Sequence, residues 1–297
     1  MRVNILALDT STSLATVAIA VGEKVTAEAT FNTDRTLSAR LIPEIDRLLV
    51  LAGVNIADID LFAASTGPGS FTGIRGGVAT IQGLALAGGK PCVGFSSLTL
   101  LAMNFPLAAH PVCALLDARK NEVYAALFDC SSTIPSVLIS DCVLPPDNFL
   151  DLLGETTGKP VIFCGDGSVR YRNLIAERMG PQAVFAPFPL DTTRASNGAL
   201  LALHSFQNGE SLVPSRLLPT YLRASDAEIN RPPNRNSADT FSRIFLFICT
   251  KASLFRLVSL VHFYLICRAD TITSLRLDPT LGEFSDRAQS PSLERTP

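Results

Sequence analysis

Residues 65–89 read STGPGSFTGIRGGVATIQGLALAGG, and the order of the elements on both sides follows from this segment. The apolar run at 59–64 predicts a buried strand, and the GPG sequence at 67–69 predicts a tight turn. Ser70 or Thr72 can then cap a helix that ends at about Ala87, before two further glycines. The segment therefore predicts a strand, a turn and a long helix.

The predicted helix contains four internal glycines, each of which costs about 1 kcal/mol relative to alanine, so close packing must offset them. One helical face carries the apolar stripe Phe71, Ile74, Val78, Ile81 and Ala85. A second, mostly small face carries Gly73, Gly77, Thr80 and Leu84. We expect the first face to contact the domain's own sheet. The second face is expected to contact another helix, either 37–52 of the same chain, the equivalent helix of a partner, or both.

Composition places the protein among reduced, non-basic globular proteins. Its 297 residues suffice for two domains, and a net charge of −2 gives no basic field for nucleic-acid binding. The N-terminus runs straight into a strand, without the pattern of a leader. The seven cysteines are scattered, with no CxxC pair, which is typical of reduced buried thiols. These features predict a cytoplasmic protein.

The two halves of the chain repeat one order of elements. The first half predicts strands at 3–9, 14–21 and 25–31, a helix at 37–52, the strand and helix described above, a strand at 91–95 and a helix at 96–103. The second half predicts strands at 112–117, 122–129, 137–143 and 161–164 and helices at 147–153, 171–179 and 195–206. A duplicated βββαβα unit predicts two facing α/β domains, 1–107 and 108–229.

The C-terminal tail, 230–297, has a different character. It begins with a linker-like RPPNRNSADT sequence, and its apolar part at 244–267 is interrupted by Lys251 and Arg256. The longest run without a charged residue is eleven residues, whereas a bilayer span needs about 20. We expect an atypical tail without a fold of its own and no membrane span.

A candidate nucleotide site follows the first strand of each half. A phosphate-binding turn requires an aspartate to place Mg²⁺ and then glycine, so that backbone N–H groups reach the phosphate. The turn after Asp9 contains hydroxyl residues but no glycine, and the turn after Asp117 contains Arg119 and Lys120. The candidate residues are Asp9, Thr10, Ser11, Thr12, Asp117, Arg119, Gly165 and Gly167. They indicate an incomplete site, and Gly165 and Gly167 also suit a plain turn.

Other chemistries find less support. The three histidines lack the spacing of metal ligands, and Ser70 lacks the flanking glycines of a hydrolase nucleophile. Asp9 and Asp117 are a conceivable acid/base pair, although carboxylates at strand ends more often form turns. We therefore predict neither a catalytic residue nor a metal ligand.

Three motifs in order carry a family resemblance: DTST at 9–12, GPGSFTGIR at 67–75 and DARKNEVY at 117–124. With GDGS at 165–168 and LLPTYLR at 217–223, the chain resembles the TsaB (YeaZ) family over about residues 2–228. The resemblance implies two actin/Hsp70-like (ASKHA, ribonuclease-H-like) domains. It also implies a non-catalytic subunit in the synthesis of threonylcarbamoyladenosine at position 37 of tRNAs that read ANN codons.

The resemblance further implies partners. A TsaB protein pairs with TsaD, which performs the transfer, and with the ATPase TsaE; ATP or ADP and the metal belong to those subunits, and tRNA is met only through the complex. The predicted partner interface comprises Leu41, Ile45, Leu48, Gly73, Arg75, Gly77, Thr80 and Leu84. Two other hypotheses remain open at this point: a free-standing ATP-dependent kinase or ATPase of the same fold, and a homodimer through the same helical face.

Overall fold

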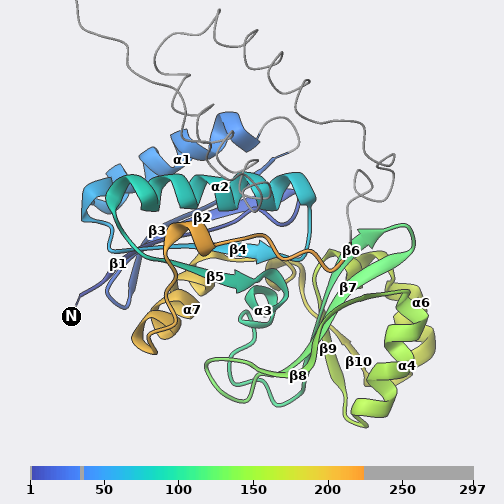
Figure 1. The fold of residues 1–297 in the computed structure, drawn as a ribbon. Helices are drawn as coiled ribbons and strands as arrows, with labels where there is room; N and C mark the ends of the chain where they lie inside the picture. The colour runs from blue at the N-terminus through green and yellow to red at the C-terminus, as the bar shows by residue number, and fades with distance from the viewer. Residues whose placement is uncertain (1, 34–36, 224–297) are drawn as a thin grey trace, which may run out of the picture. The chain divides into compact units, whose positions relative to one another are not determined.

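The computed structural model describes residues 2–33 and 37–223. The strands of these residues form two five-stranded sheets of the same topology, which confirms the predicted duplication (Figure 1). The predicted tail at 230–297 lies outside the described residues.

The first sheet has the order β3-β2-β1-β4-β5. Its first three strands are antiparallel neighbours, and β4 and β5 join them in parallel. The elements of this half are β1 (Asn4–Asp9), β2 (Leu14–Val21), β3 (Lys24–Asn32), α1 (Leu37–Ala52), β4 (Leu61–Gly67), α2 (Phe71–Gly88), β5 (Cys92–Ser96) and α3 (Ser97–Ala102). Short 3₁₀ turns (Ile56–Asp58, and in the second half Gly180–Gln182, Phe188–Leu190 and Pro214–Arg216) connect elements.

The second sheet has the order β10-β9-β6-β7-β8, which is the first order read from its other edge. Again three antiparallel strands are extended by two parallel ones. The elements are β6 (Val112–Arg119), β7 (Glu122–Asp129), β8 (Ser136–Leu144), α4 (Pro146–Thr156), β9 (Val161–Cys164), α5 (Asp166–Arg170), α6 (Arg172–Met179), β10 (Ala183–Phe185) and α7 (Ala195–Gln207). This is the predicted α/β class with the actin/Hsp70-like order in each half.

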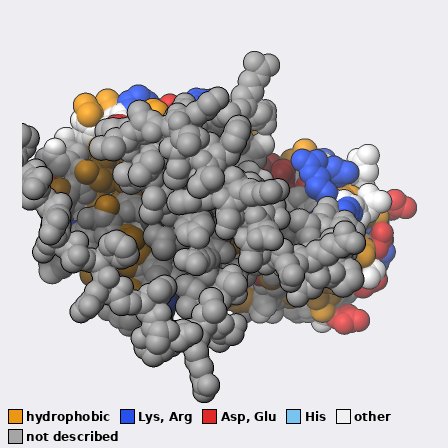
Figure 2. All heavy atoms as spheres, turned by 45° about the horizontal axis from the view of Figure 1, so that its top comes forward, with side chains coloured by type: hydrophobic (Ala, Val, Ile, Leu, Met, Phe, Trp, Pro, Cys, Tyr) orange, Lys and Arg blue, Asp and Glu red, His pale blue; other side chains and the backbone are white. Residues whose placement is uncertain are grey.

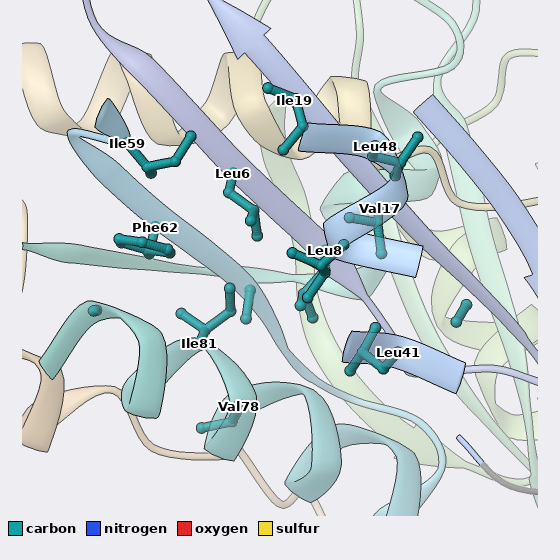
Figure 3. Close-up of a cluster of buried hydrophobic side chains, with 14 of the residues drawn as sticks. Leu6, Leu8, Val17, Ile19, Leu41, Leu48, Ile59, Phe62, Val78 and Ile81 are labelled. Atoms are coloured by element: carbon teal, nitrogen blue, oxygen red, sulfur yellow. The ribbon is translucent and has the colours of Figure 1, made fainter. Parts of the chain in front are cut away.

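Alternation along β1 assigns its side chains to two cores. Leu6 and Leu8 point to the face covered by α1 and α2, which lie side by side in Figure 1, while Ile5 and Ala7 point to the opposite face. Figure 3 shows the first core, where Leu41 and Leu48 from α1 and Val78 and Ile81 from α2 meet the strands. The sheet is thus buried on both faces, as its apolar strands require.

The two halves exchange one helix each. Helix α7, from the end of the second half, covers the other face of the first sheet through Ala199, Ala202 and Leu203. Helix α3, from the end of the first half, packs with Leu98 and Leu101 against the second sheet. The predicted boundary at 107/108 therefore separates the two sheets but not their cores, because each core is completed by a helix from the other half.

Helix α2 has the ends that its sequence indicates. The Ser70 side chain accepts a hydrogen bond from the Gly73 N–H at 3.3 Å, which selects Ser70 over Thr72 as the cap. At the other end Gly89 adopts φ +62°, the left-handed conformation that glycine allows.

Pro43 neither starts nor ends α1, which runs through it from Leu37 to Ala52.

Candidate functional site

The turn after β1 is built around the buried carboxylate of Asp9. Its Oδ1 accepts from the Ser11 N–H (3.1 Å) and from the Ser65 hydroxyl, and its Oδ2 accepts from the Ser11 hydroxyl (3.1 Å) and the Thr193 hydroxyl (2.6 Å). Asp9, Ser11, Ser65 and Thr193 are all buried. Every donor comes from the chain itself, so the carboxylate accepts four internal hydrogen bonds and stabilises the turn.

This geometry does not suit a magnesium nucleotide at Asp9. A metal ion needs the lone pairs that the four donors already occupy. The next hydroxyls are also engaged: Thr10 Oγ1 donates to the Gly73 carbonyl (2.8 Å), and Thr12 Oγ1 donates to the Leu14 carbonyl (3.0 Å). The candidate residues Asp9, Thr10, Ser11 and Thr12 therefore bind their own chain.

The small face of α2 contacts this turn. A Cβ atom on Gly77 would lie 2.2 Å from Thr10 Oγ1, and one on Gly73 would lie 2.1 Å from the Thr10 carbonyl oxygen. A Cβ atom on Gly69 would lie 2.3 Å from the Ser11 carbonyl oxygen. That oxygen also accepts a hydrogen bond from the Ser70 N–H at 2.7 Å. The prediction that Gly73 and Gly77 contact a helix from elsewhere is wrong, because these glycines let α2 approach the β1 turn. A Cβ on Gly76, in contrast, would lie 3.2 Å from Leu37 of α1.

The matching aspartate of the second half, Asp117, lies in an ionic network. Its Oδ1 accepts from the Arg119 N–H (3.0 Å), and its Oδ2 pairs with Arg170 (2.9 Å) and the Arg119 guanidinium (3.5 Å). Its own N–H donates to Asp166, whose carboxyl pKa is raised chiefly by burial. Figure 2 shows Lys and Arg side chains gathered over the second half of the molecule, with acidic side chains beside them. Asp117 is thus engaged by arginines.

Gly165 and Gly167 serve close packing. A Cβ on Gly165, where φ is +92°, would lie 2.2 Å from the Leu115 carbonyl oxygen, and one on Gly167 would lie 2.9 Å from the Leu115 carbonyl carbon. The two glycines let α5 approach β6, which agrees with the plain turn and not with the alternative, a backbone that admits a nucleotide. Within residues 2–33 and 37–223, no three His, Cys, Asp or Glu side chains are grouped to hold a metal ion.

The exposed surface of α1 and α2 differs from the predicted interface. Leu41, Ile45 and Leu48 are only 1–2% exposed and belong to the first core, so their assignment to a partner interface is wrong. Thr80 donates to the Gly76 carbonyl of its own helix, and Leu84 packs against the same core. The apolar stripe of α1 packs against the sheet of its own domain, as the apolar face of an amphipathic helix usually does.

Other apolar side chains of these two helices face solvent. We use the name exposed helix face for the exposed side chains of α1 and α2, whose large apolar members are Ile42, Val50, Leu51 and Leu86. Val50 is the most open of them, at 81% exposed. Val50 and Leu51 are adjacent near the end of α1, and Leu86 lies near the end of α2, which runs beside α1 in Figure 1. Contiguous exposed apolar surface of this kind marks protein-binding sites.

Arg75 is the one predicted interface residue that is exposed, and it belongs to the exposed helix face. Its guanidinium carbon lies 4.0 Å from the centre of the Phe71 ring, and its Nε donates to the Tyr221 hydroxyl at 2.6 Å. Tyr221 belongs to the segment 214–223, which returns along α2. Gln82 donates to the Pro214 and Leu217 carbonyls (3.1 and 2.8 Å) and fixes this segment. Sequence reasoning missed Tyr221, because nothing local indicates that residue 221 meets residue 75.

These observations define a class: a two-sheet protein of the actin/Hsp70-like fold in which the strand-end turn at Asp9 is closed by the chain's own hydroxyl groups. Comparison with known proteins is consistent with that class. The family model "TsaD: tRNA N6-adenosine threonylcarbamoyltransferase" matches residues 24–231. None of the helices in the described part of the chain is long and apolar enough to cross a membrane.

Individual relatives make the assignment specific. The TsaB protein of Escherichia coli K12 is 37% identical over 223 residues, which cover 74% of this chain and 94% of that protein. The TsaB protein of Haemophilus influenzae is 42% identical over 126 residues, 41% of this chain and about half (52%) of that protein. The structure of YeaZ from Pseudomonas aeruginosa is 30% identical, has a TM-score of 0.62 and matches 74% of this chain and 100% of its own. The chain belongs to the TsaB (YeaZ) family.

Proposed function

We propose that this chain is a non-catalytic subunit in the biosynthesis of threonylcarbamoyladenosine in tRNA, and that it binds a TsaD-like transferase through the exposed helix face. The relatives named above are tRNA threonylcarbamoyladenosine biosynthesis proteins, which supports the pathway. The observation that carries the binding role is the exposure of Val50, Leu51 and Leu86 on two adjacent helices.

The geometry at Asp9 supports a role without catalysis by this chain. A kinase or ATPase of this fold needs a strand-end carboxylate that is free to place a metal ion, whereas Asp9 already accepts four hydrogen bonds. In this proposal ATP or ADP and the metal belong to the TsaD-like subunit and a TsaE-like ATPase, and tRNA is bound by the assembled complex. A free-standing ATPase is the hypothesis that this geometry disfavours.

The experiment is binding of the purified full chain to a TsaD protein, followed by measurement of modified tRNA. Val50→Glu places a charge where an apolar side chain would be buried in the complex, and we expect it to weaken binding at least about tenfold. Val169→Glu is the matched control, since Val169 is also exposed but lies on α5. We expect the control to bind normally.

Equal binding by both variants would overturn the proposed face. Steady ATP hydrolysis by the pure chain, near 1 s⁻¹ and lost in Asp9→Ala, would overturn the non-catalytic role. The same face can pair two copies of the chain by two-fold symmetry, so we expect Val50→Glu also to shift any homodimer toward monomer in analytical ultracentrifugation.

A further inference from the structure

Arg75, Phe71 and Tyr221 form a cluster at the start of α2 that the sequence did not indicate as a unit. Phe71 and Arg75 are one helical turn apart, and Tyr221 comes from the segment that returns along the helix. The two rings lie 5.1 Å apart, and the Arg75 guanidinium carbon lies 4.0 Å from the Phe71 centroid and 5.5 Å from the Tyr221 centroid. The guanidinium is thus packed against aromatic rings, although Arg75 as a whole is exposed.

This cluster fixes an exposed arginine that would otherwise be mobile. A free arginine side chain carries about 2 kcal/mol of rotamer entropy, which a binding partner would have to remove. Here the stacking contacts and the 2.6 Å hydrogen bond from Nε to the Tyr221 hydroxyl hold the guanidinium plane. Tyr221 is itself held, since the neighbouring Thr220 N–H donates to the Thr66 carbonyl at 2.7 Å. Of the guanidinium nitrogens, only Nε has a hydrogen-bond acceptor among the described residues.

The charge of Arg75 is not neutralised within the described part of the chain. Several other exposed arginines there form ion pairs: Arg47 with Glu44, Arg170 with Asp117, and Arg178 with Asp147 and Asp151. Arg172, Arg194 and Arg216 are exposed and, like Arg75, form no ion pair within the described residues. No carboxylate among the described residues pairs with Arg75. A planar guanidinium whose Nε is already engaged offers its Nη donors to one planar, two-oxygen acceptor, and a carboxylate fits that geometry.

We propose that Arg75, positioned by Tyr221 and Phe71, binds an Asp or Glu side chain of the protein that docks on the exposed helix face. This inference rests on the proposed function and names the chemistry of the contact. A carboxylate is favoured over a nucleic-acid phosphate because phosphate tracks gather several cations, whereas Arg75 contacts two aromatic rings. Arginine beside tyrosine and phenylalanine is the composition that protein interfaces enrich.

The test compares dissociation constants of full-length variants with a purified TsaD protein at low and high salt. Arg75→Met should weaken binding about 10- to 100-fold and reduce its salt dependence, because a charge pair is lost. Arg75→Lys should weaken binding almost as much, since lysine lacks the planar fork. Tyr221→Phe keeps the ring but removes the hydroxyl, and we expect a smaller loss of about three- to tenfold with an unchanged melting temperature.

Arg172→Met is the matched control, because Arg172 also stacks on an aromatic ring, at 4.1 Å from the Phe185 centroid, but on α6. It should change binding less than about twofold. Normal binding by Arg75→Met, or full binding by Arg75→Lys, would overturn the inference. Loss of tRNA binding by the complex with normal protein binding would assign Arg75 to a phosphate and also overturn it. If Val50→Glu weakens binding and Arg75→Met does not, the proposed face stands and the carboxylate contact fails.

Discussion

The Thr193 hydroxyl donates a 2.6 Å hydrogen bond to the buried carboxylate of Asp9, 184 residues earlier in the chain. The loop before α7 is therefore tied to the end of the first strand. Asp9, which the sequence placed in a candidate nucleotide site, therefore stabilises the fold through this contact.

The first prediction is that Asp9 contributes to stability. Asp9→Ala leaves the Ser11, Ser65 and Thr193 donors without an acceptor in a buried site, and should lower the free energy of unfolding by on the order of 2–4 kcal/mol. Urea denaturation measures this loss. Asp46→Ala on the exposed side of α1 is the control and should stay within about 0.5 kcal/mol. Equal stability of Asp9→Ala and wild type would show that the network is not structural.

The second prediction compares two helical glycines. Gly77→Ala would place its Cβ 2.2 Å from Thr10 Oγ1 and should destabilise the fold by about 1–3 kcal/mol through overpacking. Gly154→Ala on α4 has no neighbouring atom within 4 Å and should stabilise the protein by up to about 1 kcal/mol. Thermal unfolding of both variants checks the opposite signs. A stabilised Gly77→Ala would contradict the close approach of α2 to the turn.

The third prediction concerns pH. Burial raises the pKa of Asp141 above its ordinary value of 3.8, while the Ser96 hydroxyl donates to this carboxyl. The folded protein therefore holds this proton more tightly than the unfolded chain does, and stability falls as pH rises from 3.8 through the raised pKa. Asp141→Asn should flatten that fall, so the stability of the variant relative to wild type should rise across the same interval.

Urea midpoints measured from acidic to neutral pH would show this effect, and Asp129→Asn provides a control of opposite sign. Hydrogen bonds from Ser131 lower the pKa of Asp129, so its contribution is present above 3.8 and is lost as pH falls. Identical pH profiles for wild type and Asp141→Asn would contradict the prediction.

The fourth prediction concerns cysteine reactivity. Burial raises the pKa of Cys92 to about 11 and that of Cys130 to about 12, and it raises the pKa of Cys113 and Cys164 well above the ordinary thiol value. Because the thiolate is the nucleophile, these four should resist iodoacetamide at pH 8 in the native protein and react in urea. Peptide mapping should find Cys142, which is only half-buried, labelled before them. Early labelling of Cys113 would contradict the buried strand.

Much of the fold could be predicted because apolar strands and amphipathic helices leave a periodic signal. The apolar runs VNILALD at 3–9 and VCALLD at 112–117 predict the first strand of each half. The same order of elements follows each of these strands, which predicts the shared topology of the two sheets. Strand β10 was missed, because three residues carry no period. The place of α7 was also missed, since its apolar pattern indicates burial but not which sheet buries it.

The site was harder to predict because one pattern admits several contacts. The small face of α2 indicates a close approach, but residue type does not distinguish another helix from the Thr10 turn. The apolar stripe of α1 suits a core as well as an interface, and in the structure its residues Leu41, Ile45 and Leu48 are buried in the first core. The contact between Arg75 and Tyr221 joins positions 146 apart, which no local pattern encodes.

The exchange of α3 and α7 has a consequence for synthesis of the protein. On the ribosome, the strands of the first sheet emerge about a hundred residues before α7, the helix that covers Ile5, Ala7 and Val93. At about 5–20 residues per second, that apolar face waits roughly 5–20 s for its cover. The first half cannot complete its fold as an independent unit during translation, so the nascent chain offers a chaperone a defined apolar surface until residue 207 has emerged.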